Sequence, residues 1–213
     1  MKLEVRKLKN SICKDYLNEH LAGWGILTAQ IIDNYNVSAG SFYCLAPVNI
    51  DDKSLYSFST AKGDIISTPW PQEVVINFIH GYLKSSKFKK AIIENYSFKP
   101  NDEYIIRSKK EYFLVQDVIF YLLDANNTMD DIRECFKLAS GYGFCPMLIE
   151  SDINLIAQSE NINKEDENKL LENTCMFLTP IYDGESYLFW IKEGYTELLQ
   201  AFKKQLKSHN GEE

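Results

Sequence analysis

Cys175-Met-Phe-Leu-Thr-Pro-Ile-Tyr182 and Ser186-Tyr-Leu-Phe-Trp-Ile191 are two strand-like runs, and the pair Asp183-Gly184 lies between them. An Asp-Gly pair suits the tight turn of a β-hairpin, because both central residues of that turn need positive φ angles. The runs themselves are rich in aromatic and branched residues, which favour a pleated sheet. This stretch therefore predicts an antiparallel hairpin centred on residues 183–184.

Outside this hairpin the sequence mixes helix-like and strand-like segments without a regular alternation. Strand-like patterns occupy residues 41–46, 55–60, 65–66, 103–107, 111–115 and part of 146–157. Helix-like patterns occupy residues 12–35 with a break at two glycines, 71–83, 87–95, 116–123, 128–140 and 195–206, whereas 159–169 is polar enough for an exposed loop. Irregular order with several hairpin-length turns favours an α+β fold with a mainly antiparallel sheet. No repeat or linker divides the chain, so we expect one domain over residues 1–213 with a polar tail from about residue 207.

Charge is unevenly distributed along the 213 residues. Residues 1–110 hold 15 Lys and Arg against 11 Asp and Glu, whereas residues 111–213 hold 8 against 19, and the whole chain carries −7. An acidic half of this kind can attract a basic protein. The acidic balance also argues against nucleic-acid binding, although 84–90 is a dense basic cluster that contains Phe88.

Two further features predict the cellular compartment of the protein. Charged residues interrupt the N-terminus, and no apolar run reaches the length of a membrane span. Five scattered cysteines without a Cys-x-x-Cys pair are typical of reduced thiols. We therefore expect a cytoplasmic protein with five free thiols and no membrane association.

No segment carries a specific catalytic or metal-binding signature. Cys44 with His80, or Cys13 with His20, contains the residue types of a nucleophile pair, but neither has a surrounding motif. Acid-x-Lys triplets at 51–53 and 167–169 resemble parts of metal-dependent nuclease sites, yet so short a pattern occurs by chance in most chains. We accordingly expect no cofactor and no metal site.

These observations favour a binding protein over an enzyme. An acidic cytosolic protein can inhibit a basic partner by competing for its cationic surface, as an immunity protein or antitoxin would. Tyrosines near the acidic positions, such as Tyr142 or Tyr182, would supply apolar anchors. The predicted partner-binding residues are Asp130, Asp131, Glu134, Tyr142, Asp152, Glu165, Asp166 and Glu167.

Two alternatives remain open at this point. One is an enzyme, hydrolase or nuclease-like, whose site is dispersed in sequence; its first titratable candidates are Asp33, His80, Asp117 and Cys145. The other is an adaptor or structural component, for which a homo-oligomer is a compatible state. Convergence of the titratable candidates in one cleft would favour the enzyme.

Overall fold

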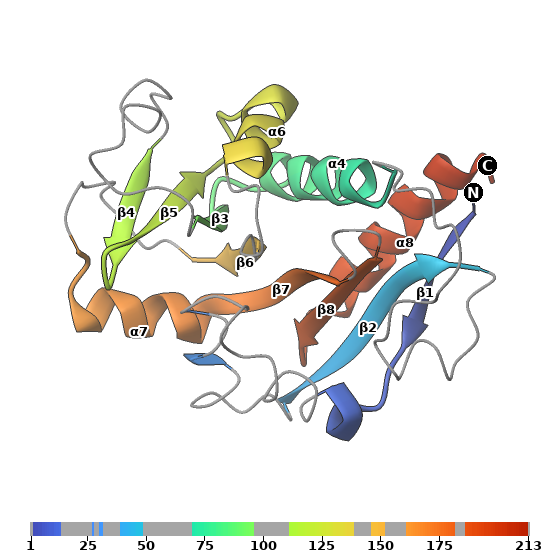
Figure 1. Cartoon of the computed structure of the whole chain (residues 1–213), viewed down its shortest axis with the longest axis horizontal. Helices are drawn as coiled ribbons and strands as arrows, with labels where there is room; N and C mark the ends of the chain where they lie inside the picture. The colour runs from blue at the N-terminus through green and yellow to red at the C-terminus, as the bar shows by residue number, and fades with distance from the viewer. Residues whose placement is uncertain are drawn as a thin grey trace.

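A single eight-stranded antiparallel sheet forms the centre of the computed structural model, which describes residues 2–13, 27, 30–31, 39–48, 70–95, 111–138, 146–151, 161–181 and 186–212 (Figure 1). Its strands lie in the order β1-β2-β8-β7-β6-β3-β5-β4. Their bounds are β1 Leu3–Lys7, β2 Gly40–Pro47, β3 Lys89–Asn95, β4 Tyr112–Val115, β5 Val118–Leu123, β6 Pro146–Glu150, β7 Thr174–Ile181 and β8 Ser186–Lys192. Every neighbouring pair is antiparallel, so the predicted α+β class is confirmed.

The hairpin predicted from the sequence is formed by β7 and β8. Their register runs from Met176 opposite Ile191 to Ile181 opposite Ser186. The four turn residues, 182–185, lie outside the described part of the chain. This hairpin occupies the middle of the sheet, with β2 on one side and β6 on the other.

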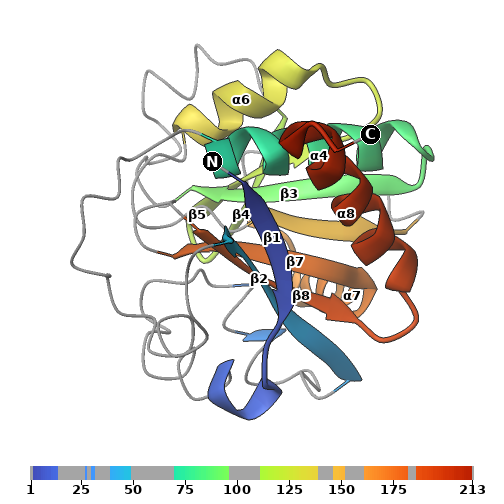
Figure 2. The same ribbon diagram turned by 90° about the vertical axis from the view of Figure 1, so that its right-hand side faces the viewer.

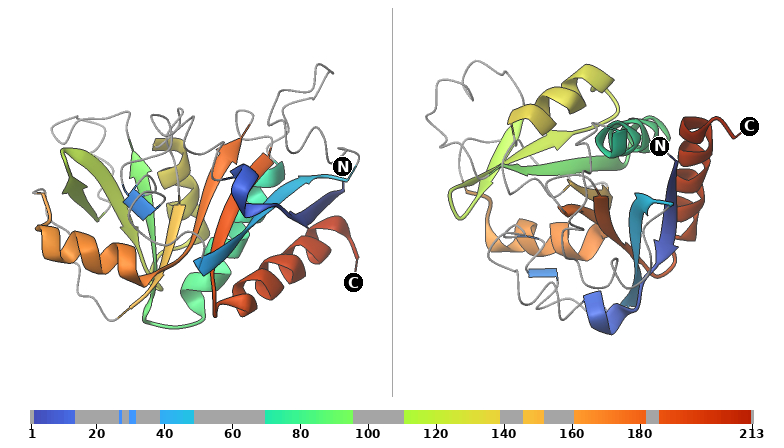
Figure 3. Two further views of the ribbon diagram at one scale, coloured as in Figure 1. Left: turned by 90° about the horizontal axis from the view of Figure 1, so that it is seen from below. Right: turned by 45° about the vertical axis from the view of Figure 1, so that its right-hand side comes forward.

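Helices cover both faces of the sheet. On one face lie α4 (Trp70–Lys84), α6 (Met129–Leu138) and α8 (Thr196–Asn210), and on the other lies α7 (Lys164–Asn173) (Figures 1 and 3). The first core therefore joins helix residues such as Phe78, Phe136 and Phe202 to one face of the strands. The second joins Leu170 and Leu171 of α7 to the opposite face. Burial on both faces explains why the central strands are almost continuously apolar.

Two helix predictions were wrong for this reason. Residues 89–95 form β3 and residues 118–123 form β5, although both were expected to be helical. Strands buried on both faces lose the polar and apolar alternation that distinguishes a strand from a helix. Before β5, Gln116 and Asp117 adopt φ angles of 50° and 64° and close a two-residue hairpin with β4.

The ends of the polar segments also differ from expectation. The polar stretch 159–169, expected as an exposed loop, contains the first part of α7. At the C-terminus, α8 continues to Asn210, so residues 207–210 of the predicted tail are helical. The Asn210 side chain exchanges two hydrogen bonds with the backbone of Leu3, and Lys2 pairs with Glu212 at 2.8 Å, which attaches this end of the chain to β1.

Candidate functional site

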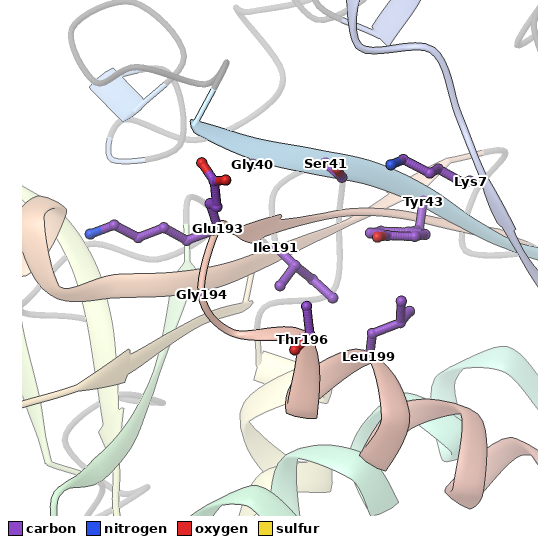
Figure 4. Close-up of a pocket in the computed structure, with 10 residues that line it drawn as sticks. Lys7, Gly40, Ser41, Tyr43, Ile191, Glu193, Gly194, Thr196 and Leu199 are labelled. Atoms are coloured by element: carbon purple, nitrogen blue, oxygen red, sulfur yellow. The ribbon is translucent and has the colours of Figure 1, made fainter.

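A groove of about 320 Å³ opens between the face of β2 and β8 and the first turns of α8 (Figure 4). Tyr43, Ile191 and Leu199 supply its apolar surface. Lys7, Ser41, Glu193 and Thr196 surround them with polar groups. Lys192 also belongs to the lining, but its Nζ donates to the Glu172 carbonyl at 2.8 Å and is engaged with α7.

Close packing explains why the groove has this shape. Gly40 lies against Ile191 and the Trp190 ring so closely that a Cβ at this position would collide with both. Gly194, at φ 93°, turns the chain sharply from β8 into α8. The Tyr43 ring stacks on Phe189 with centroids 5.5 Å apart, so the bottom of the groove is continuous with the core. An apolar floor with a polar rim is the composition of a protein-binding surface.

The acidic residues predicted on α6 lie on its solvent side. Ile132, Cys135 and Phe136 are buried, while Asp130 and Glu134 are exposed. Asp131 accepts hydrogen bonds from the Thr128 backbone N–H at 2.8 Å and from its hydroxyl at 2.9 Å, and its own N–H donates to the Thr128 Oγ1. This reciprocal capping confirms the helix start expected at residue 128.

An arginine connects α6 to α4. Arg133 donates hydrogen bonds to both carboxylate oxygens of Glu73 on α4 and to Asp130. The contact with Asp130 is the shortest, at 2.7 Å. These hydrogen bonds raise the pKa of the Arg133 guanidinium, and those that Glu73 accepts contribute most. Glu73 and the α6 carboxylates therefore belong to one surface.

On α7 the predicted acidic residues behave differently. Glu165 and Asp166 lie 2.7 Å and 3.5 Å from Lys169, and Glu167 lies 2.9 Å from Lys164. Glu167 was expected to be exposed, but only 6% of it is accessible. It is buried because its position precedes Leu170 and Leu171 by three and four residues, which places it on the helix face that meets the sheet.

The predicted acidic residues therefore do not form one face. Ile132 and Phe136 of α6 belong to the core on one side of the sheet, and Leu170 and Leu171 of α7 belong to the core on the other. Tyr142, Asp152 and Tyr182 lie outside the described residues. The sequence gives the charge of each helix, but the face of the sheet that each helix covers depends on tertiary contacts.

The basic cluster 84–90 runs from the last residue of α4 through the turn into the start of β3. Lys84 donates to the Ala125 carbonyl at 2.6 Å, and Lys89 lies 4.9 Å from the centre of the Tyr82 ring. Phe88 is 46% exposed, with Lys87 over its ring at 5.0 Å. These lysines are thus partly used in contacts within the chain.

The groups named for a dispersed enzyme site are not brought together where they are described. His80 is on α4, whereas Asp117 is in the β4–β5 turn and exchanges two 3.0 Å hydrogen bonds with Asn161, just before α7. Asp33 and Cys145 lie outside the described residues. Cys44 belongs to the core on the α7 side, so the sheet separates it from α4 and His80.

The described cysteines Cys13, Cys44, Cys135 and Cys175 are buried and unbridged. Burial raises the pKa of Cys13, Cys44 and Cys175 to about 12. A thiol with such a pKa stays protonated at neutral pH and is a poor nucleophile. These three cysteines are therefore core residues whose burial favours the protonated thiol.

Sequence reasoning missed two features. One is the groove, whose glycines and tyrosine come from segments about 150 residues apart. The other is a set of asparagine side chains that bond to strand edges: Asn10 on β2, Asn161 on the β4–β5 turn and Asn210 on β1. An asparagine amide offers both a donor and an acceptor, as a neighbouring strand does, but its sequence position alone does not reveal this use.

Comparison with known proteins provides no relative: no family model, no curated protein and no solved structure matches this chain. Within the described residues, no group of three or more His, Cys, Asp or Glu side chains is arranged to hold a metal ion. No described helix is both long and apolar enough to cross a membrane.

Proposed function

We propose that this chain is a protein-binding protein that neutralises a basic partner, and that the solvent side of α6 carries the contact. An immunity protein or an antitoxin that blocks a nuclease is one concrete form of this function. The observation that carries the proposal is the division of α6 into a buried apolar side and an exposed acidic side. Anchoring by Ile132, Cys135 and Phe136 presents its carboxylates on a fixed element.

The α6 surface is a better candidate than α7. The side chain of Asp130 is 90% exposed, and Glu73 extends the surface onto α4 through Arg133. Asp130 and Glu73 share the single cation Arg133, whereas the three predicted carboxylates of α7 lie within 3.5 Å of two lysines of the same helix. Glu167 is also buried, so α7 offers fewer exposed carboxylates to an outside cation. Rim carboxylates of this kind act mainly by steering a basic partner toward the surface.

A photo-crosslinking amino acid in place of Glu134 would identify the partner, with the same substitution at Glu165 on α7 as the matched control. We expect crosslinks from position 134 to a basic protein and none from position 165. Stopped-flow association of the purified pair should then slow by about tenfold from low to physiological salt, because ions screen the steering.

The variant Asp130→Asn/Glu134→Gln removes two exposed charges and keeps the Arg133–Glu73 contact. We expect it to associate several-fold more slowly, whereas Glu165→Gln should associate like the unaltered protein. Association that is independent of salt and equal in both variants would contradict the proposal.

A further inference from the structure

The outer edge of β1 presents backbone groups that β2 does not use. Leu8 N–H donates to the Phe42 carbonyl at 2.9 Å, and Val48 N–H donates to the Lys2 carbonyl at 3.1 Å. Antiparallel pairing alternates, so residues 2, 4, 6 and 8 direct their backbone groups toward β2. The N–H and C=O groups of Leu3, Val5 and Lys7 therefore point away from the sheet.

The outward backbone groups of one of these three residues, Leu3, are already hydrogen-bonded to a side chain. The Asn210 amide donates to the Leu3 carbonyl at 2.8 Å and accepts from the Leu3 N–H at 3.2 Å. No corresponding bond to the outward groups of Val5 or Lys7 comes from the described part of the chain. Figure 2 shows β1 in front of the other strands, with α8 beside it.

The far edge of the sheet provides a useful contrast. There, Ile162 N–H donates to the Leu114 carbonyl of β4 at 2.8 Å, and Asn161 bonds to Asp117. Unused strand edges are normally covered in this way, because they can pair with another chain. The segment from Val5 to Lys7 thus offers two donors and two acceptors to an added strand.

We propose that this edge of β1 binds an extended acidic segment of another protein, which adds to the sheet as a ninth strand. The argument for an acidic segment is charge: residues 2–9 contain four basic residues and one acidic residue, and Lys7 and Lys9 are exposed. Backbone bonds to Val5 and Lys7 give affinity, and side chains of alternate residues give specificity. This surface lies on the strand edge, apart from α6, so the inference is independent of the function proposed above.

The groove extends the same surface. Lys7 lines its rim, and Val5 packs against the core on the side of α8. Alternate side chains of an added strand point toward that side. A residue that lies beside Lys7 therefore reaches the mouth of the groove.

A second copy of the chain fits this edge less well. In an antiparallel pair centred on Val5, Lys7 faces Leu3 of the other copy, whose backbone groups are held by Asn210. In a pair centred on Arg6, the two Arg6 side chains face each other directly, and like charges in that position are destabilising. A different chain has no Asn210 to occupy its backbone groups opposite Lys7. If it carries carboxylates, it also places no like charge opposite Arg6.

The test uses a fluorescent eight-residue peptide in which valine and glutamate alternate, and the full chain. Fluorescence anisotropy should show saturable binding, and a peptide that alternates valine and lysine should not bind. Val5→Pro removes the outward N–H but no bond to β2, and proline is tolerated at such edge positions. We expect it to weaken binding by about tenfold, the loss of one hydrogen bond, while Val5→Ala stays within about twofold.

Hydrogen exchange on the unaltered protein gives a readout that needs no variant. The acidic peptide should slow exchange of the Val5 and Lys7 amides and leave the Arg6 amide, already bonded to β2, unchanged. Absence of binding at millimolar peptide, or equal binding to Val5→Pro and Val5→Ala, would overturn the proposal. Dimerisation detected by sedimentation and lost in Val5→Pro would also overturn it, because the occupant would then be a second copy.

Discussion

At the scale of single residues, Tyr82 connects α4 to an irregularity in the sheet. The pairing of β6 with β7 shifts register between Leu148 and Ile149. The Tyr82 hydroxyl donates to the Ile149 carbonyl at 2.8 Å and lies 3.4 Å from the Cys175 Sγ, which itself donates to the Leu148 carbonyl at 3.2 Å. Two side chains thus satisfy backbone carbonyls next to this register shift, where strand pairing is interrupted.

Tyr82→Phe should therefore lower the free energy of unfolding by about 1–2 kcal/mol, because the buried Ile149 carbonyl loses its hydroxyl donor. Urea denaturation measures this change. A double-mutant cycle with Cys175→Ala should give a coupling energy of at least about 0.5 kcal/mol, since the two side chains are in contact. Strictly additive effects would show that the hydroxyl and the thiol stabilise the fold independently.

At the scale of elements, α7 shows that one carboxylate of a mainly acidic helix can be buried while its neighbours are exposed. Glu167 lies on the face of Leu170 and Leu171, while Glu165 is exposed and paired with Lys169. Glu167→Lys places a second cation beside Lys164 in a buried position, and we expect a loss of about 1–3 kcal/mol in unfolding free energy. Glu165→Lys, the matched control, should change stability by less than about 0.5 kcal/mol. Thermal unfolding of the two variants measures both changes in stability. Equal losses for Glu167→Lys and Glu165→Lys would contradict the difference in burial between the two positions.

The elements that the sequence predicts well have local signals. Asp183-Gly184 identified the β7–β8 hairpin, and Thr128 with Asp131 identified the start of α6. The strands β3 and β5 were missed because burial on both faces removes the alternation on which a strand prediction depends.

The candidate surfaces depend even more on tertiary structure. The positions of acidic residues are evident from the sequence, but their separation onto opposite faces of the sheet is not. The groove and the open part of β1 arise from pairing between residues 3–7, 40–47 and 186–192. Such non-local contacts leave no pattern within any one segment.

At the scale of the whole molecule, buried titratable groups occupy both cores. Cys13 and Cys44 lie in the core on the α7 side, and Tyr82 and Cys175 lie in the core on the α4 side. Burial raises the pKa of each thiol from an ordinary value of 9 to about 12, and it also raises the pKa of Tyr82. Between these values the unfolded chain loses protons that the folded chain retains.

Stability should consequently be unaffected by these thiols below pH 9 and should fall as the pH rises from 9 toward 12, because fewer protons are bound in the unfolded state than in the folded state. Urea denaturation at pH 8, 9, 10 and 11 measures the slope. Lysines also titrate in this range, so the variant Cys13→Ala/Cys44→Ala is the control. It should lose less stability between pH 9 and 11 than the unaltered protein, and the difference isolates the thiols of one core. Parallel pH profiles for the two proteins would show that these thiols ionise as readily in the folded chain as in the unfolded one, contrary to their burial beneath the sheet.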